Sequence, residues 1–421
     1  MTSATEIKMN KSKLVRITTV PISLRVLLRG QFRFMSENGF AVKAVSSEGD
    51  DLYHVQQSES IPVFPLEMTR TISPLKDIKS LWQFYKFCKK EKPTIVHSHT
   101  PKAGIVGMLG AKLAGVPVRL HTVAGLPLME ATGIKRKVLD IVEKLTYSCA
   151  TKVYPNSKGL YDFILENKFT AVDKLKVIAN GSSNGIDTSF FSPDQISNNE
   201  KKALREHLGI LDSDFVFIFV GRLVGDKGMN ELVQAFRKLE EVREGDLGMG
   251  RGEERRGVKL LLVGSLETEL DPLKPETLKE IETNPNIISV GFQKDVRPYF
   301  AISDALAFPS YREGFPNVVM QAGAMGLPSI VSDINGCNEI VIEGQNGTIV
   351  PSKNVEKLME AMRKISHDKA YYEQLQRNAR KMIETRYEQR VVWEALLAEY
   401  NSLLEQKGLI PHTQSSHRLN N

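Results

Sequence analysis

The chain has 421 residues, of which 41% are hydrophobic and 25% charged, the composition of a soluble globular protein. Its length exceeds one ordinary hydrophobic core and predicts two domains. No apolar run approaches the roughly 18 residues of a membrane-spanning helix, and the polar start MTSATEIKMN lacks the apolar core of a signal peptide, so we expect a cytoplasmic protein.

Charge is divided unevenly along the chain. Residues 1–187 contain 27 of the 56 Lys and Arg and 16 of the 50 Asp and Glu, a net charge of +11, which leaves 29 and 34, or −5, for the remainder. A basic half suits an anionic partner, either nucleic acid or the inner membrane surface, and an ordinary solvated face is the alternative.

Short apolar runs alternate with helix-length amphipathic segments throughout. The runs are LVRITTV, FAVKAVSS, TIVHSH, VPVRLHTV, TKVYPNS and KLKVIANG before residue 187, and FVFIFVG, VKLLLVG, NIISVGF, ALAFPS, LPSIVSD and GTIVP after residue 210. This repeated order predicts an α/β protein with two parallel sheets, each covered by helices on both sides.

The polar segment SPDQISNNEKK separates the two sets and reads as a linker. The expected parts are two Rossmann-like domains, a C-terminal helix that packs back on the first domain, and a flexible tail, at residues 12–187, 205–385, 386–405 and 406–421. The helix places Val391, Leu396 and Tyr400 near one face. The Gly-rich, charged residues 241–257 predict a surface loop.

Ligands bind open parallel sheets beyond the carboxyl ends of the strands, and two such domains that face each other create a deep cleft. One loop at such a place lies in FVFIFVGRLVGDKGMNELVQAF, where a strand ends at Gly221 and a helix begins near Lys227 or Gly228. Arg222 and Lys227 then lie where helix-terminal amides and two cations converge on a phosphate group. The alternative is that both are surface charges on a turn.

A second loop is REGFPNVVMQ, which follows the run ALAFPS. Pro316 can occupy the first position of a helix, with the amides of Gly314 and Phe315 exposed at the helix start, where an anion or polar ligand is favoured. Glu313 lies just outside this helix, where a carboxylate accepts hydrogen bonds from sugar hydroxyls. The alternative is that Glu313 only caps the helix.

Together these segments resemble the retaining glycosyltransferases of family 4, which have the GT-B fold. The resemblance rests on GRL-x-x-x-KG, EGFPN, AGAMGLPSIVSD and NEIVIEGQNGTIVP, in the family's order, and covers most of the chain. It implies that Arg222 and Lys227 bind the diphosphate of a nucleotide-sugar donor. It also implies that Glu313 contacts hydroxyls of the donor sugar, while the amides after Gly314 help to hold sugar or phosphate.

The chain departs from the family pattern in both halves. The family usually has a second Glu eight residues after the first, in contact with the ribose; here that position is Gln321, on one helix face with Asn317, and its amide can still accept from a ribose hydroxyl. VPISLRVLLRGQF replaces the family's Gly-rich first loop, with only Gly30 nearby. HTVAGLPLMEATG has Ala124 where relatives place a His, and His121, three positions earlier, is expected to be a structural strand-end residue.

No metal site is evident. Cys88, Cys149 and Cys337 lack metal-ligand spacing and are too few for a disulfide framework, so we expect reduced packing residues. His97 and His99 alternate on one strand face, which favours packing, and EGDD has no second ligand cluster. We therefore expect no metal and no cofactor beyond the nucleotide-sugar co-substrate.

Basic and apolar residues mingle in RVLLRGQFRFM and IKSLWQFYKFCKK. Such segments can rest on anionic lipid headgroups, and a core-facing amphipathic helix with a basic edge is the alternative. With the basic first half, and the resemblance to enzymes of surface-polysaccharide assembly, they favour a polyprenyl-diphosphate-linked glycan acceptor and a peripheral position on the inner face of the membrane. Lys102, in HSHTPKAG, is placed for an anionic acceptor, and Gly30 and Gly125 complete the acceptor candidates.

We therefore predict an enzyme that transfers a hexosyl or N-acetylhexosaminyl group from a UDP-sugar to a lipid-linked glycan, with retention implied by the resemblance. Transfer to a soluble sugar or sugar phosphate, nucleotide-sugar epimerisation, and a carbohydrate-binding scaffold are the alternatives. A Rossmann dehydrogenase is disfavoured because no G-x-G-x-x-G follows the first strand, and no basic groove or recognition helix predicts nucleic acid. The catalytic candidates are Arg222, Lys227 and Glu313. The donor-binding candidates are Gly221, Phe292 beside the base, Gly314, Phe315, Pro316, Asn317 and Gln321.

Overall fold

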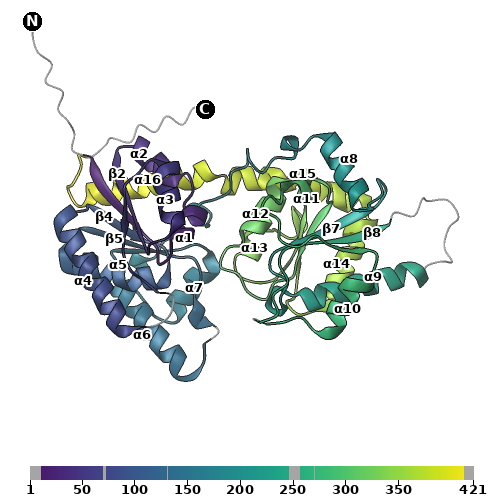
Figure 1. The fold of residues 1–421 in the computed structure, drawn as a ribbon, viewed down its shortest axis with the longest axis horizontal. Coiled ribbons are helices and arrows are strands. Elements are labelled where there is room, and N and C mark those ends of the chain that lie inside the picture. Colours follow the sequence, from purple (N-terminus) through teal and green to yellow (C-terminus); the bar gives the residue numbers. More distant parts are fainter. Residues whose placement is uncertain (1–10, 70–72, 130, 246–256, 270, 412–421) are drawn as a thin grey trace, which may run out of the picture. The chain divides into compact units, whose positions relative to one another are not determined.

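The computed structural model describes residues 11–69, 73–129, 131–245, 257–269 and 271–411. Contacts divide the chain into two compact units, and each contains one six-stranded sheet (Figure 1). The first unit extends to Asn156 and adds Leu160–Asn184 and the C-terminal part from Val392. The second consists of Ser157–Gly159 and Gly185–Val391.

Both sheets are built from parallel strands. The strands of the first are β1 (Ser12–Ile17), β2 (Phe40–Ser46), β3 (Val63–Pro65), β4 (Ile95–Ser98), β5 (Val118–Val123) and β6 (Lys152–Pro155). Those of the second are β7 (Phe215–Val220), β8 (Val258–Val263), β9 (Ile287–Ser289), β10 (Ala305–Phe308), β11 (Ser329–Ser332) and β12 (Gly347–Val350). The spatial orders are β3-β2-β1-β4-β5-β6 and β12-β11-β10-β7-β8-β9. The strand order reverses between β1 and β4 and between β7 and β10, so each sheet has a topological switch point there.

Helices cover both faces of each sheet. They are α1 (Pro21–Leu27), α2 (Gln31–Glu37), α3 (Asp50–Glu59), α4 (Pro74–Glu91), α5 (Pro101–Ala114), α6 (Gly133–Cys149), α7 (Lys158–Glu166), α8 (Asn198–His207), α9 (Met229–Gly245), α10 (Pro275–Thr283), α11 (Arg297–Ala301), α12 (Asn317–Ala324), α13 (Cys337–Ile340), α14 (Val355–His367), α15 (Lys369–Tyr387) and α16 (Gln389–Gln406). In Figure 1, α1, α2, α3 and α16 lie on one face of the first sheet, and α4, α5 and α6 on the other. In the second unit, α8, α11, α12 and α15 lie on one face, and α9, α10 and α14 on the other.

The alternation of side chains along β1 explains the two cores of the first unit. Val15 and Ile17 join the core on the α4–α6 side of the sheet. Leu14 joins the core on the other side, where α16 contributes Leu396 and Tyr400. The second unit has one continuous core that spans its sheet and helices. The predicted parallel sheets with helices on both faces are confirmed.

The predicted C-terminal helix is interrupted. Glu388, with an extended ψ of 139°, separates α15 from α16. Val391 was predicted to share the inward face with Leu396 and Tyr400, but it is 37% exposed, and Val392 is buried instead. Val392 precedes Leu396 by four residues and therefore lies on its face of the helix, whereas Val391 is turned away.

Three local expectations differ from the observed elements. KLKVIANG forms no regular strand, and its Leu175 makes only an isolated parallel bridge with Val153. The three-residue β3 was not predicted because so short a run carries no periodic signal. The segment expected to be a linker contains the start of α8, where the side chains of Ser197 and Glu200 cap each other's backbone N–H groups.

Some expectations fall outside the described residues. The predicted surface loop over 241–257 begins within α9, and residues 246–256 lie outside the described part, as do 412–421 of the predicted tail. Within the described ranges, no helix is both long and apolar enough to cross a membrane. Cys88, Cys149 and Cys337 are buried free thiols, as predicted.

Candidate active site

The candidate site lies at the switch point of the second sheet. β7 and β10 are neighbours, and each continues from its carboxyl end into a loop. The loop after β7 carries Arg222 and the 3₁₀ turn η4 (Gly225–Lys227), and the loop after β10 carries Glu313 and leads into α12. Because parallel strands end at the same edge of a sheet, the two loops meet there. The structure thus brings the three catalytic candidates together.

Two glycines allow this close approach of backbone segments. Gly228 follows η4 with a φ of +71°, and a Cβ there would lie 2.1 Å from the carbonyl oxygen of Pro309. Gly264, after β8, has a φ of +154°, and its Cβ would lie 1.8 Å from the carbonyl oxygen of Gly221. No side chain fits at either position, so the loops after β7, β8 and β10 are packed backbone to backbone.

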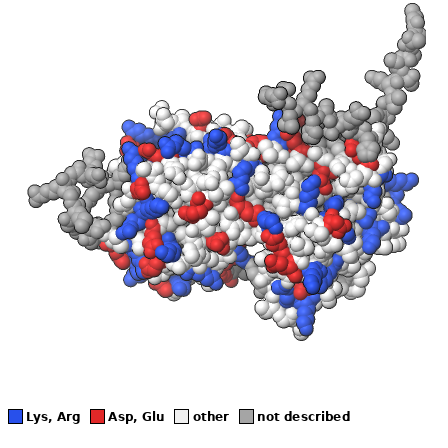
Figure 2. Space-filling view, turned by 180° about the vertical axis from the view of Figure 1, so that it is seen from behind, with Lys and Arg blue, Asp and Glu red and all other residues white. Residues whose placement is uncertain are grey.

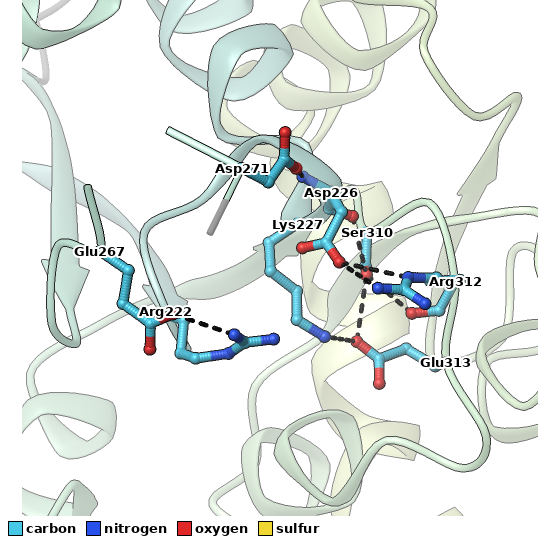
Figure 3. A network of polar contacts seen from close by, with 8 residues as sticks. All are labelled: Arg222, Asp226, Lys227, Glu267, Asp271, Ser310, Arg312 and Glu313. Carbon is cyan, nitrogen blue, oxygen red and sulfur yellow. Dashed lines mark hydrogen bonds and ion pairs between the residues drawn. The ribbon is translucent and has the colours of Figure 1, made fainter. Parts of the chain in front are cut away.

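Lys227 and Glu313 form an ion pair at the centre of the site (Figure 3). Lys227 Nζ lies 2.5 Å from Glu313 Oε1, and the side chains are 18% and 16% exposed. The hydroxyl of Ser310 donates to the same Oε1 at 3.0 Å. The side chains expected to touch phosphate and sugar are therefore each other's partners in this structure.

Arg222 has a carboxylate partner of its own. Its Nη1 lies 3.0 Å from Oε2 of Glu267, on the loop after β8. The two side chains are 46% and 32% exposed, and exposed ion pairs stabilise by only about 0–1 kcal/mol. Arg222 can therefore exchange Glu267 for another anion at little cost. Glu267 was not predicted as a site residue, because nothing in SLETEL indicates which strand end lies beside it.

Asp226 fixes the turn η4 from two sides. Its N–H donates to Asp271 Oδ2 at 2.5 Å, and its Oδ2 accepts from Arg312 Nη2 at 2.8 Å. The N–H of Tyr311 donates to the carbonyl oxygen of Asp226 at 2.9 Å. These contacts tie the loops after β7, β8 and β10 together next to Lys227. None of these partners was among the sequence candidates, although Asp226 lies within the motif GRLVGDKG.

The helix after Glu313 begins one residue later than predicted. Pro316 is the N-cap residue of α12, with an extended ψ of 112°, so Asn317 takes the first helical position. Phe315 is only 9% exposed and belongs to the core of the second unit. The side-chain amide of Asn335 donates to the carbonyl oxygen of Gly314 at 2.7 Å. An apolar anchor and an amide thus hold this loop in place.

The other donor candidates lie on α12 and on the loop after β9. Gln321 is half-buried and Asn317 is exposed, one turn apart on α12. Phe292 is 76% exposed, and the neighbouring Gln293 donates its side-chain amide to the carbonyl oxygen of Val290 at 2.8 Å. The roles assigned to Phe292, Asn317 and Gln321 remain predictions.

Two acceptor candidates in the first unit have structural partners. Gly30 has a φ of +79°, and a Cβ there would lie 2.6 Å from the indole of Trp393, so glycine is needed where α16 packs. Lys102 Nζ lies 2.5 Å from Asp77 Oδ2, and the Lys102 side chain is 10% exposed. Gly125 follows β5 and has open space where a Cβ would lie. The acceptor role of all three remains a prediction.

His97 and His99 belong to a buried polar cluster in the first unit. Arg16 is fully buried and donates from Nε to His99 Nε2 at 2.9 Å. His97 is hydrogen-bonded to the hydroxyls of Tyr400 at 2.6 Å and Thr122 at 2.8 Å. A cavity of about 20 Å³ beside them has room for a water molecule. Burial first, and neighbouring positive charge second, lower the pKa values of both His residues well below the usual range, so both are neutral.

His121, on β5, is also buried and hydrogen-bonded. Its Nδ1 is hydrogen-bonded to Ser98 Oγ at 2.8 Å, and burial lowers its pKa to about 4. A Cβ at Gly104 would lie 2.6 Å from the imidazole, so the ring fills its space. In the part of the chain that the structure describes, no three His, Cys, Asp or Glu residues form a group that could hold a metal ion.

Comparisons with known proteins cover both halves of the chain. Residues 25–181 match the family model described as "Glycosyl transferase 4-like domain", and residues 200–382 match "Glycosyl transferases group 1". The capsular polysaccharide biosynthesis glycosyltransferase CapM of Staphylococcus aureus is 33% identical over 398 residues, which span 94% of this chain and 99% of CapM. The chain belongs to the family 4 glycosyltransferases.

Further relatives of this glycosyltransferase carry more specific names. A UDP-Gal:α-D-GlcNAc-diphosphoundecaprenol α-1,3-galactosyltransferase of Escherichia coli is 28% identical, over 86% of this chain and 89% of the relative. Among solved structures, a glycosyltransferase from Rickettsia africae has a TM-score of 0.74 at 19% identity, covering 94% of this chain and 99% of that one. Anabaena HepE in complex with UDP has a TM-score of 0.73 at 18% identity, covering 93% and 100%. These structures establish the predicted GT-B fold.

Proposed function

We propose that this enzyme transfers a sugar from a UDP-sugar to a glycan carried on a polyprenyl diphosphate, during assembly of a surface polysaccharide. The observation that carries the donor half is the Lys227–Glu313 pair beside Arg222, at the carboxyl edge of the second sheet. The acceptor half is supported by relatives from Escherichia coli and Campylobacter jejuni, whose names specify acceptors linked to undecaprenyl diphosphate. CapM, which is named as a glycosyltransferase of capsular polysaccharide biosynthesis, supports a role in the assembly of a surface polysaccharide.

The donor site would work by exchange of partners. A nucleoside diphosphate needs fixed cations, and Arg222 and Lys227 are each held by one carboxylate. A bound diphosphate takes over both cations. Glu313 is then released to accept hydrogen bonds from hydroxyls of the donor sugar, and Ser310 keeps its carboxylate oriented.

The same groups would stabilise the transition state. As the bond from the sugar to the diphosphate breaks, negative charge grows on the leaving oxygens and the ring gains oxocarbenium character. Arg222 and Lys227 face the leaving oxygens, and removal of one such preorganised donor slows a reaction by about 100- to 1000-fold. The bonds of Asp226 to Asp271 and Arg312 keep Lys227 in place without reorganisation.

We also propose retention of configuration and independence from metal. In the proposed step, the C1–O bond to UDP breaks and the C1–O bond to the acceptor forms on the same face. The acceptor hydroxyl gives its proton to the departing phosphate oxygen. Because two protein cations serve the diphosphate, a chelator should leave the rate unchanged.

One assay tests this function. The purified enzyme is incubated with UDP-glucose, UDP-galactose and their N-acetyl counterparts, each with GlcNAc on a synthetic polyprenyl diphosphate. The expected product is a lipid-linked disaccharide with an α-linkage by NMR, formed with release of UDP. Lys227→Met should slow product formation by about 100- to 1000-fold, and Lys238→Met, which removes a surface ion pair with Glu356, should not.

Other outcomes would replace the proposal. Transfer only to a free sugar phosphate would identify a soluble acceptor. A changed nucleotide sugar without acceptor would identify an epimerase, and tight UDP binding without turnover would identify a scaffold.

A further inference from the structure

Helix α6 carries an apolar stripe on its outer side in addition to the face that packs on the first unit. Its exposed apolar residues are Ile134 (83%), Val138 (41%), Ile141 (65%) and Leu145 (43%). Their spacing of three and four residues places them in one stripe along the helix. The face turned to the protein interior carries Glu143, Thr146, Tyr147 and Cys149, of which Tyr147 and Cys149 belong to the core of the first unit. A stripe of this kind calls for a partner that covers it.

Helix α4 carries a second exposed apolar stripe. Leu75, Ile78 and Trp82 are 86%, 64% and 56% exposed, again three and four residues apart. Trp82 stacks on Tyr85, with ring centres 5.1 Å apart, and Lys86 Nζ lies 5.3 Å from the Trp82 ring. Both α4 and α6 pack against α5 on the same face of the first sheet (Figure 1). The stripes therefore belong to one side of the first unit.

These stripes begin at the functional end of the sheet. In a unit of alternating parallel strands and helices, the helices run opposite to the strands, so their first turns lie at the carboxyl edge. Leu75 and Ile134, the most exposed of these residues, lie in the first turns of α4 and α6. The apolar surface thus reaches the edge where parallel sheets bind their ligands.

The two helices are also strongly basic. α4 has five Lys and two acidic residues, and α6 has four Lys or Arg and two acidic residues, so the pair has nine basic and four acidic side chains. Asp77, Glu91 and Asp140 are in ion pairs with basic side chains, and Glu143 is buried. In Figure 2, Lys and Arg gather along the right-hand edge, on the side where α4 lies. Lysine therefore dominates the outward charge of α4 and α6.

We infer that the exposed faces of α4 and α6 form a docking surface for a bilayer with anionic headgroups. Apolar side chains enter the boundary between headgroups and acyl chains, and the flanking lysines neutralise the lipid phosphates. A second copy of the chain fits less well, because a two-fold interface would place the same lysines against each other. The inference rests on the proposed function in one respect: it names the surface that brings the enzyme to a lipid-linked acceptor.

Vesicle binding tests this surface without donor or acceptor. Sedimentation with vesicles of phosphatidylglycerol and phosphatidylcholine should capture the wild-type protein, and pure phosphatidylcholine should not. Ile134→Ser/Ile141→Ser should weaken binding by at least about tenfold, since two apolar side chains lose their burial. Lys135→Glu/Lys137→Glu should weaken it by about 25-fold or more, since each Lys contributes about fivefold. Leu211→Ser, which changes a 66% exposed residue of the second unit, is the matched control.

Fluorescence locates the contact on α4. The chain has two Trp residues, and Trp82 is the exposed one on this surface, so its emission should shift to shorter wavelength with anionic vesicles. Trp82→Phe should remove the shift. No binding by the wild type, or equal binding by Ile134→Ser/Ile141→Ser, would overturn the inference. A wild-type dimer that these substitutions dissociate, without vesicle binding, would assign the surface to a second copy.

The two proposals fail separately. UDP-induced thermal stabilisation is measured on each variant, because a ligand that binds the folded state raises its stability. Vesicle binding without a UDP response would refute the donor site and keep the docking surface. A UDP response without vesicle binding would do the reverse.

Discussion

Lys227 and Glu313 are 86 positions apart in the chain, and their side chains meet at 2.5 Å between the loops after β7 and β10. One was expected to hold a phosphate and the other a sugar. Because each neutralises the other, the site keeps two opposite charges part-buried without a ligand. In the proposed function, donor binding replaces this contact within the protein by contacts with the donor.

Glu313→Gln should reduce turnover without weakening the binding of UDP. Hydrogen bonds to a charged group contribute about 1.5–3 kcal/mol, so we expect kcat/KM for the donor sugar to fall about 10- to 100-fold. UDP affinity, measured by calorimetry, should stay equal or rise, because Lys227 loses a competing carboxylate. Unchanged kcat/KM would remove Glu313 from the donor-sugar site.

Arg222→Met and Lys227→Met should each lower kcat by about 100- to 1000-fold, because each removes a cation at the leaving diphosphate. Steady-state rates with a saturating donor measure this effect, with Lys238→Met as control. If both variants changed only KM, the cations would bind substrate and transition state equally.

Glu267→Gln should make the enzyme bind UDP more tightly. The substitution leaves Arg222 without its carboxylate partner. Because the pair is largely exposed, the affinity for UDP should rise by no more than about fivefold. Calorimetric titration with UDP decides the point. Weaker binding by the variant would mean that Glu267 holds Arg222 in its working position.

Gln321→Glu should be tolerated. Either side chain can accept a hydrogen bond from a ribose hydroxyl, so we expect kcat/KM within about fivefold of the wild type. The comparison uses the same donor and acceptor concentrations for both proteins. Complete loss of activity would show that neutrality at this position matters.

Acid should destabilise the first unit as pH falls from about 6.5. Burial lowers the pKa values of His97, His99 and His121, so the unfolded chain binds protons that the folded chain does not. Each such His costs up to about 1.4 kcal/mol of unfolding free energy per pH unit between its unfolded and folded pKa. Burial raises the pKa of Glu143 to about 7, so this carboxyl binds a proton in the folded chain at pH values where the unfolded chain has released it. Its protonation therefore stabilises the folded state as pH falls and offsets the effect of one His.

Urea denaturation at several pH values measures the slope. His121→Gln should reduce the loss of stability between pH 6.5 and 4.5, because one of the three His protons no longer contributes. An equal slope in the variant would show that His121 titrates alike in both states.

The sequence was informative where a local motif coincides with a strand end. Arg222, Lys227 and Glu313 could be placed because their loops follow apolar runs, and parallel strands bring such loops to one edge. Glu267 and Asp271 could not be placed in this way. They join the site only because β8 lies beside β7, and strand order is set by packing across the whole sheet.

Which side of a helix faces the protein interior was harder to predict than the place of these loops. The stripe from Ile134 to Leu145 has the spacing of a buried face, yet it is exposed, and Glu143 is buried. Periodicity identifies two faces of a helix without saying which one the fold turns inward. The same ambiguity explains why Val391 was placed in the core where Val392 belongs.

The contribution of α16 to the first unit has a consequence for biosynthesis. Leu396, Tyr400, Leu403 and Leu404 of α16 complete a core whose other buried members lie between Leu14 and Ile178 and are translated about two hundred residues or more earlier. A ribosome therefore finishes the second unit, which ends at Val391, before it releases the helix that closes the first. Until α16 is synthesised, one face of the first sheet is incompletely covered. Chaperone protection should therefore be needed longest for the segment that emerges from the ribosome first.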